Sequence, residues 1–64
     1  MTIQDDIDVL NRRIAKAEAD RDTWRAAGVQ ERYLAAYVMV EALDFQLAQK
    51  RRELRALRDA VTGP

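Results

Sequence analysis

The sequence has no cysteine and no histidine, and it has only two glycines and one proline among its 64 residues. The missing cysteine and histidine exclude disulfide bonds, zinc-finger ligand sets, thiol nucleophiles and histidine general bases. The two glycines, Gly28 and Gly63, stand too far apart to form a glycine-rich phosphate-binding loop. We therefore expect a protein that is not an enzyme, with no catalytic residues, no cofactor and no bound metal.

Neither sign of charge is in excess, because 11 Lys and Arg residues balance 11 Asp and Glu residues. No net charge therefore draws the chain to nucleic acid or to an anionic membrane. The longest apolar run, residues 33–40, is far shorter than the roughly 20 residues that span a bilayer. The N-terminus is acidic where a signal peptide would be basic. We expect a cytoplasmic protein with no membrane contact.

Residues 3–27 contain no glycine or proline and carry a heptad pattern that predicts a helix. Thr2 is suited to cap its start, with Asp5 three residues on as in a capping box. Gly28 is the predicted stop, and a left-handed Gly28 would bring Trp24 and Val29 into contact. The pattern alternates steps of four and three residues, with Arg21 at its one polar position: Ile3, Ile7, Leu10, Ile14, Ala17, Arg21 and Trp24.

Residues 30–61 carry a second heptad pattern, broken only by Lys50, which predicts a longer helix with a frayed tail at 62–64. Its members are Tyr33, Ala36, Val40, Leu43, Leu47, Lys50, Leu54, Leu57 and Val61. A turn at 28–29 leaves the two helices one compact arrangement, an antiparallel hairpin. The chain is thus expected to be one all-α domain over residues 1–64, a coiled-coil-like helical hairpin.

In such a hairpin, residues that face each other have numbers adding to about 56. Opposite charges then meet, because Asp5 falls opposite Arg51, Asp6 opposite Lys50, and Arg12 opposite Asp44. Each exposed pair is worth only a few tenths of a kcal/mol. We expect these pairs to specify the direction and register of the hairpin rather than its stability.

The second helix has more apolar surface than one neighbouring helix covers, because residues 33–47 are apolar almost all round. We expect self-association, first as a homodimer that forms a two-fold symmetric four-helix bundle, and a non-catalytic role as a small regulator or adaptor. A larger protein partner would cover the same surface. The expected interface residues are Leu34, Tyr37, Val38, Met39, Phe45 and, beyond the reach of the first helix, Leu57 and Val61.

Two charged groups suggest other functions. Glu41 and Asp44 lie on one helix face, as paired carboxylates of acid–base or metal sites do, but no Glu-x-x-His pair accompanies them. We expect instead that Asp44 pairs with Arg12 or Arg13 and that Glu41 faces solvent or an arginine of a partner chain. Residues 40–44 resemble the Ser-Gln-Glu-Leu-Asp signature of helical-hairpin sporulation-regulator phosphatases at Leu43 and Asp44 only.

A basic stretch gives the alternative function, a nucleic-acid-associated regulator: Lys50, Arg51, Arg52, Arg55 and Arg58.

Aromatic side chains gather near the turn, where Trp24, Tyr33 and Tyr37 are expected. We expect Trp24 to close the end of the hairpin core, whereas Tyr37 points away from the main seam and suits either solvent or a partner. Arg21, one turn before Trp24, is expected to stack on its ring or to extend toward solvent.

Overall fold

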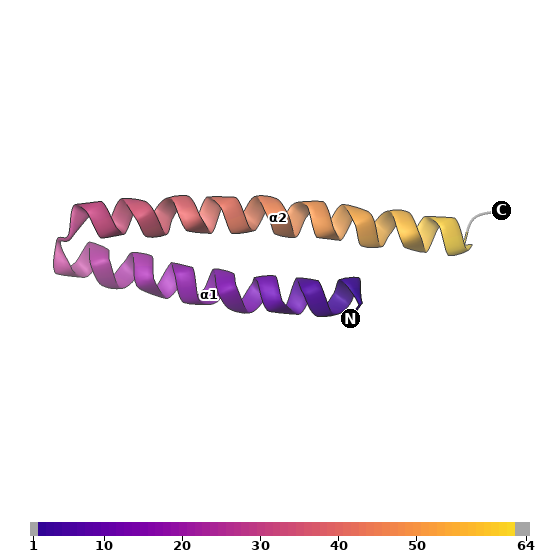
Figure 1. Cartoon of the computed structure of the whole chain (residues 1–64), viewed down its shortest axis with the longest axis horizontal. Helices are drawn as coiled ribbons and strands as arrows, with labels where there is room; N and C mark the ends of the chain where they lie inside the picture. Colours follow the sequence, from indigo (N-terminus) through magenta and orange to yellow (C-terminus); the bar gives the residue numbers. More distant parts are fainter. Residues whose placement is uncertain (1, 63–64) are drawn as a thin grey trace.

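The computed structural model describes residues 2–62, without the side chain of residue 62. The chain forms two antiparallel α-helices, α1 (Ile3–Ala27) and α2 (Gln30–Thr62), which lie side by side along the whole of α1 (Figure 1). The all-α hairpin predicted from the heptad patterns is confirmed. Thr62 belongs to α2 rather than to a frayed tail, and residues 63 and 64 lie outside the described residues.

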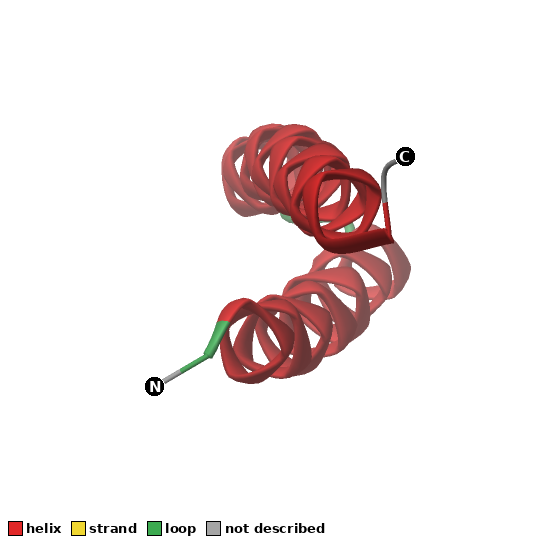
Figure 2. Cartoon of the chain, turned by 90° about the vertical axis from the view of Figure 1, so that its right-hand side faces the viewer, coloured by secondary structure: helices red, strands yellow, loops and turns green. Residues whose placement is uncertain are grey.

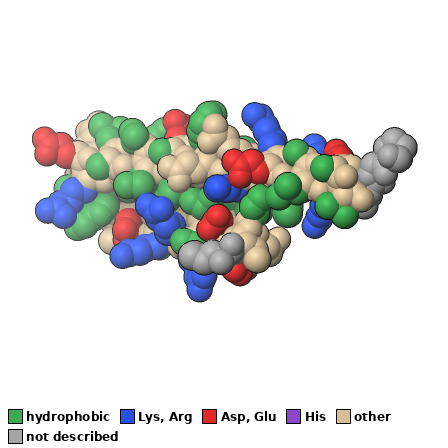
Figure 3. All heavy atoms as spheres, turned by 45° about the vertical axis from the view of Figure 1, so that its right-hand side comes forward, with side chains coloured by type: hydrophobic (Ala, Val, Ile, Leu, Met, Phe, Trp, Pro, Cys, Tyr) green, Lys and Arg blue, Asp and Glu red, His purple; other side chains and the backbone are tan. Residues whose placement is uncertain are grey.

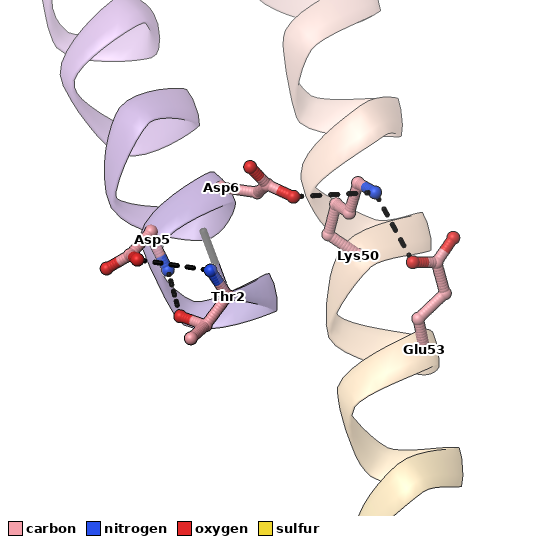
Figure 4. A network of polar contacts seen from close by, with 5 residues as sticks. All are labelled: Thr2, Asp5, Asp6, Lys50 and Glu53. Carbon is pink, nitrogen blue, oxygen red and sulfur yellow. Dashed lines mark hydrogen bonds and ion pairs between the residues drawn. The ribbon is translucent and has the colours of Figure 1, made fainter.

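A capping box begins α1, as the Thr2-to-Asp5 spacing predicted. The Thr2 hydroxyl oxygen accepts a hydrogen bond of 3.1 Å from the Asp5 backbone N–H, and the Asp5 carboxylate accepts one of 3.1 Å from the Thr2 backbone N–H (Figure 4). Two backbone N–H groups that have no partner within the helix are thereby satisfied. The carboxylates of Asp5 and Asp6 also lie at the positive end of the helix dipole.

The turn between the helices is only two residues long and depends on Gly28. Gly28 adopts the left-handed conformation, with φ 73° and ψ 20°. Its N–H donates to the Arg25 carbonyl at 3.2 Å, and the Val29 N–H donates to the Trp24 carbonyl at 3.0 Å. These two bonds make up a Schellman motif, which confirms the ending predicted from Gly28. The chain reverses here and α2 starts at once.

Within residues 2–61, the core is a single seam of seven buried apolar residues between the helices. They are Ile7, Leu10, Ile14 and Ala17 of α1 and Val40, Leu43 and Leu47 of α2. Three pairs across the seam have numbers that add to 57, close to the register expected from the turn. At the open end of the hairpin, Ile3 and Leu54 pack against this cluster while remaining partly exposed. The predicted heptad seams are therefore the contact surfaces of both helices.

The hairpin is long and thin, with extents of 55 × 16 × 14 Å. Viewed along the length of the hairpin, α1 and α2 are inclined to one another (Figure 2), and residues 2–62 form no third element. Its accessible surface is 5133 Å² for a mass of 7.4 kDa, whereas a compact monomer of that mass exposes about 4,200 Å². The second helix also extends past the start of α1 (Figure 1).

Replacing Gly28 tests the turn, because a Cβ at this position would meet no atom within 4 Å. Gly28→Ala should therefore lower the stability of the hairpin only through its left-handed backbone, by about 1 kcal/mol or more. Gly28→Asn is the matched control and should cost less, since Asn tolerates this conformation better. Thermal unfolding followed by circular dichroism measures both. A higher melting temperature for Gly28→Ala would indicate one continuous helix through residue 28.

Candidate interaction surface

The face of α2 that points away from α1 is apolar along its first half. We define this outer face by Leu34, Val38, Ala42 and Phe45. At 100° per residue, Leu34, Val38 and Phe45 lie roughly 150° or more around the helix from the direction of the buried seam. All four side chains are exposed. The hairpin therefore cannot cover this face with its own α1.

The exposure of the outer face is large for side chains of this kind. Val38 is 64% exposed and Phe45 is 63% exposed, whereas Leu43 on the seam is 2% exposed. Figure 3 shows hydrophobic side chains reaching the surface along α2, with a few acidic and basic side chains among them. Contiguous apolar patches of this type mark interaction sites more often than ordinary surface.

The other predicted interface residues are exposed too, but they lie elsewhere on α2. Tyr37 and Met39 flank the outer face on opposite sides of the helix. Leu57 and Val61, the latter 83% exposed, lie on the seam side of α2 near its C-terminal end. Their contact with another chain stays a prediction.

A carboxylate adjoins the outer face and affects a neighbouring tyrosine. Hydrogen bonding to Glu41, together with the negative charge of that carboxylate, raises the pKa of the Tyr37 hydroxyl above its ordinary value. The ring of Tyr37 also lies near that of Tyr33, with centroids 6.2 Å apart and planes tilted by 46°. Glu41 and Tyr37 are thus neighbours one turn apart on α2, beside the outer face.

A guanidinium from across the turn lies over the ring of Trp24, and it belongs to Arg32 rather than to the predicted Arg21. The guanidinium carbon of Arg32 lies 4.9 Å from the centroid of Trp24. Arg21 instead pairs with Asp22 at 3.3 Å and with Glu18 at 4.0 Å. The numbers of Trp24 and Arg32 add to 56, so the hairpin register itself could have identified this pair. Such contacts contribute about 0.5–1 kcal/mol at exposed sites.

Three charge pairs between the helices were predicted, and one of them is formed within residues 2–62. The Lys50 ammonium lies 3.8 Å from the Asp6 carboxylate and 3.4 Å from that of Glu53 (Figure 4). The predicted pair of Asp5 with Arg51 does not form, because the Asp5 carboxylate accepts from Thr2 instead. The predicted pair of Arg12 with Asp44 is not formed either.

The basic stretch does not present one continuous basic surface. Lys50 is engaged by two carboxylates, and Arg52 projects toward the outer face of α2, since it lies about 160° around the helix from Lys50. Arg51, Arg55 and Arg58 surround Leu54 in a shallow hollow. Three of the five predicted basic residues are therefore brought together.

The described residues offer no group of acidic side chains arranged to hold a metal ion, Glu41 and Asp44 included. Within the same residues, neither helix is long and apolar enough to cross a membrane. The grooves between the helices are shallow and of mixed polarity, lined for example by Val9, Arg13 and Gln49. The outer face of α2 is consequently the feature of this fold that calls for an explanation.

Comparison with known proteins gives no further guide, because no family model, curated protein or solved structure matches this chain.

Titration of Tyr37 tests its contact with Glu41 beside the outer face. In a Tyr33→Phe background, where Tyr37 is the remaining tyrosine, Glu41→Gln should lower the pKa of Tyr37, because the charge that opposes the phenolate is removed. The absorbance of tyrosinate near 295 nm, followed against pH, measures this. Because folding raises the pKa of Tyr37, the contact stabilises the folded chain at pH values below the ordinary tyrosine pKa. This stabilisation is lost as the pH rises through the raised pKa of the folded chain. An unchanged midpoint would show that Glu41 does not act on Tyr37.

Proposed function

We propose that this chain is a non-catalytic interaction module that self-associates through the outer face of α2. The supporting observation is the exposure of Leu34, Val38 and Phe45 on a helix face that α1 does not cover. A second copy is the partner that fits best, because a copy brings an identical apolar face of equal length. Such two-fold pairing of identical surfaces is the commonest arrangement in soluble oligomers.

The surface area supports a dimer of ordinary size. The chain exposes about 900 Å² more than a compact monomer of its mass, and a standard protein–protein interface buries about 800 Å² per partner. A hairpin of 64 residues with a single seam of seven buried side chains also has little core of its own. Association would give α2 a second packed side and so stabilise the fold.

Charge placed on the outer face tests the proposal. Val38→Glu together with Phe45→Glu should weaken association at least about 100-fold, because burying each such side chain is worth about 1.5–3 kcal/mol. Light scattering at tens of micromolar should give a multiple of the 7.4 kDa chain mass for the wild type and the single mass for the variant. Helicity should fall as well, since burial supplies most helix stability.

The matched control places the same two charges on the exposed back of α1. Ala15 and Ala19 are both exposed there, so Ala15→Glu with Ala19→Glu should leave the mass in solution unchanged. A wild-type chain that scatters as a 7.4 kDa monomer would refute self-association outright.

A nucleic-acid-associated role is the second candidate, supported by the three arginines that converge around Leu54. Phosphate contacts of this kind would give binding to duplex DNA that falls steeply as salt increases, with each neutralised phosphate contributing to the slope. Fluorescence anisotropy of a labelled duplex between 50 and 200 mM salt, roughly the range over which such contacts are lost, measures it. The double variant Arg55→Gln/Arg58→Gln should then reduce the salt dependence of DNA binding. If the chain is only a self-association module, the same variant should still form the dimer and the wild type should not bind DNA.

A further inference from the structure

The two halves of the outer surface of α2 differ in the size of their side chains. The first half carries Leu34, Val38 and Phe45, and the second half carries three exposed alanines, Ala48, Ala56 and Ala60, with the polar residues Gln49 and Asp59 beside them. Between the large residues stands Glu41, and between the alanines stands Arg52, both exposed and both on this side of the helix. Large apolar side chains thus gather in one half and small ones in the other, with Glu41 in the first half and Arg52 in the second.

We infer that two copies of α2 pair antiparallel over their full length, so that Glu41 of each copy lies against Arg52 of the other. This inference rests on the proposed self-association and specifies its geometry. Two helices spanning Gln30–Thr62 overlap completely when the numbers of facing residues add to about 92. Glu41 and Arg52 face each other when the numbers add to 93, within one residue of complete overlap.

The same register places large side chains against small ones. Numbers that add to 93 put Phe45 against Ala48 of the second copy. Numbers that add to 94 put Val38 against Ala56 and Leu34 against Ala60. Alternation of large and small residues across facing positions is what lets two helix surfaces interdigitate at the density of a protein interior. The register that favours this packing therefore lies within one residue of the register that pairs Glu41 with Arg52.

Two alternative arrangements leave Glu41 against an unfavourable neighbour. A parallel pair would place Glu41 against Glu41 and Arg52 against Arg52. An antiparallel pair shifted to bring Val38 onto Phe45 would place the two Glu41 side chains next to each other across the two-fold axis. Like charges at such close positions cost free energy, and they cost more where the surroundings exclude water. The full-length antiparallel register gives each Glu41 an opposite charge.

Charge reversal at the two positions tests this geometry in the full chain. Glu41→Arg alone and Arg52→Glu alone should each weaken homodimerisation roughly tenfold, because each creates two like-charge pairs per dimer. The double variant Glu41→Arg/Arg52→Glu should recover the wild-type affinity. Mixing the two single variants should give a heterodimer tighter than either homodimer, since both charge pairs are then opposite. Analytical ultracentrifugation, with one variant labelled, measures all of these.

The mixture separates the pairing from a structural effect, since residues 41 and 52 are eleven apart on one helix and do not meet within a chain. Asp44→Arg is the control: it makes the same change of charge on α2 at a position to the side of this face, and it should affect dimerisation much less. If the wild type dimerises but the mixture shows no preference for the heterodimer, the register is wrong while self-association stands. If the wild type is monomeric, both are wrong.

Discussion

The two-residue turn at Gly28 and Val29 fixes which residue of α2 faces each residue of α1. A Schellman motif with a left-handed glycine leaves the chain no freedom to slide, because its two backbone hydrogen bonds hold the end of one helix against the start of the next. The register then extends 20 residues down the hairpin to the pair Asp6 and Lys50. Nearer the turn it sets Arg32 over Trp24.

A seam so defined uses only one side of each helix, and that limit shapes the rest of the molecule. The seam buries most of the large apolar side chains of the first helix, since the exposed residues of that helix are mostly charged, polar or alanine. The second helix is not, because Leu34, Val38 and Phe45 occupy the opposite side. A lone two-helix hairpin has no third layer with which to bury a second face. The unsatisfied face is therefore a property of the architecture and not of one poorly placed side chain.

The sequence was sufficient to predict the features that depend on repeated patterns. Heptad spacing identified both helices and the seam, and the single mid-chain glycine identified the turn. Prediction from the sequence failed for side chains that have several possible partners within reach. Asp5 was expected to face Arg51, yet the backbone N–H of Thr2 is closer in sequence and already fixed by the helix start. Arg21 was expected to stack on Trp24 or to extend toward solvent, yet its guanidinium lies near carboxylates three residues before it and directly after it.

Those failures share a physical cause. Exposed long side chains gain only tenths of a kcal/mol from any one charged partner, so a local partner, which costs little ordering, prevails over one that only the fold brings near. Lys50 is the exception because it bridges a local partner, Glu53, and a distant one, Asp6, at once. A pattern of charges along two helices therefore predicts their direction well and their individual pairs poorly.

The same reasoning explains why charges within an apolar face are informative. Exposed to water on a single hairpin, Glu41 and Arg52 would each be solvated at no cost, and no ion pair is needed. Placed between two apolar helices, either one alone would lose its hydration and gain nothing in return. An arrangement that brings them together offsets that loss by their mutual attraction. Two charges of opposite sign, set at mirrored positions on the uncovered face of one helix, thus restrict the ways in which that face can be covered.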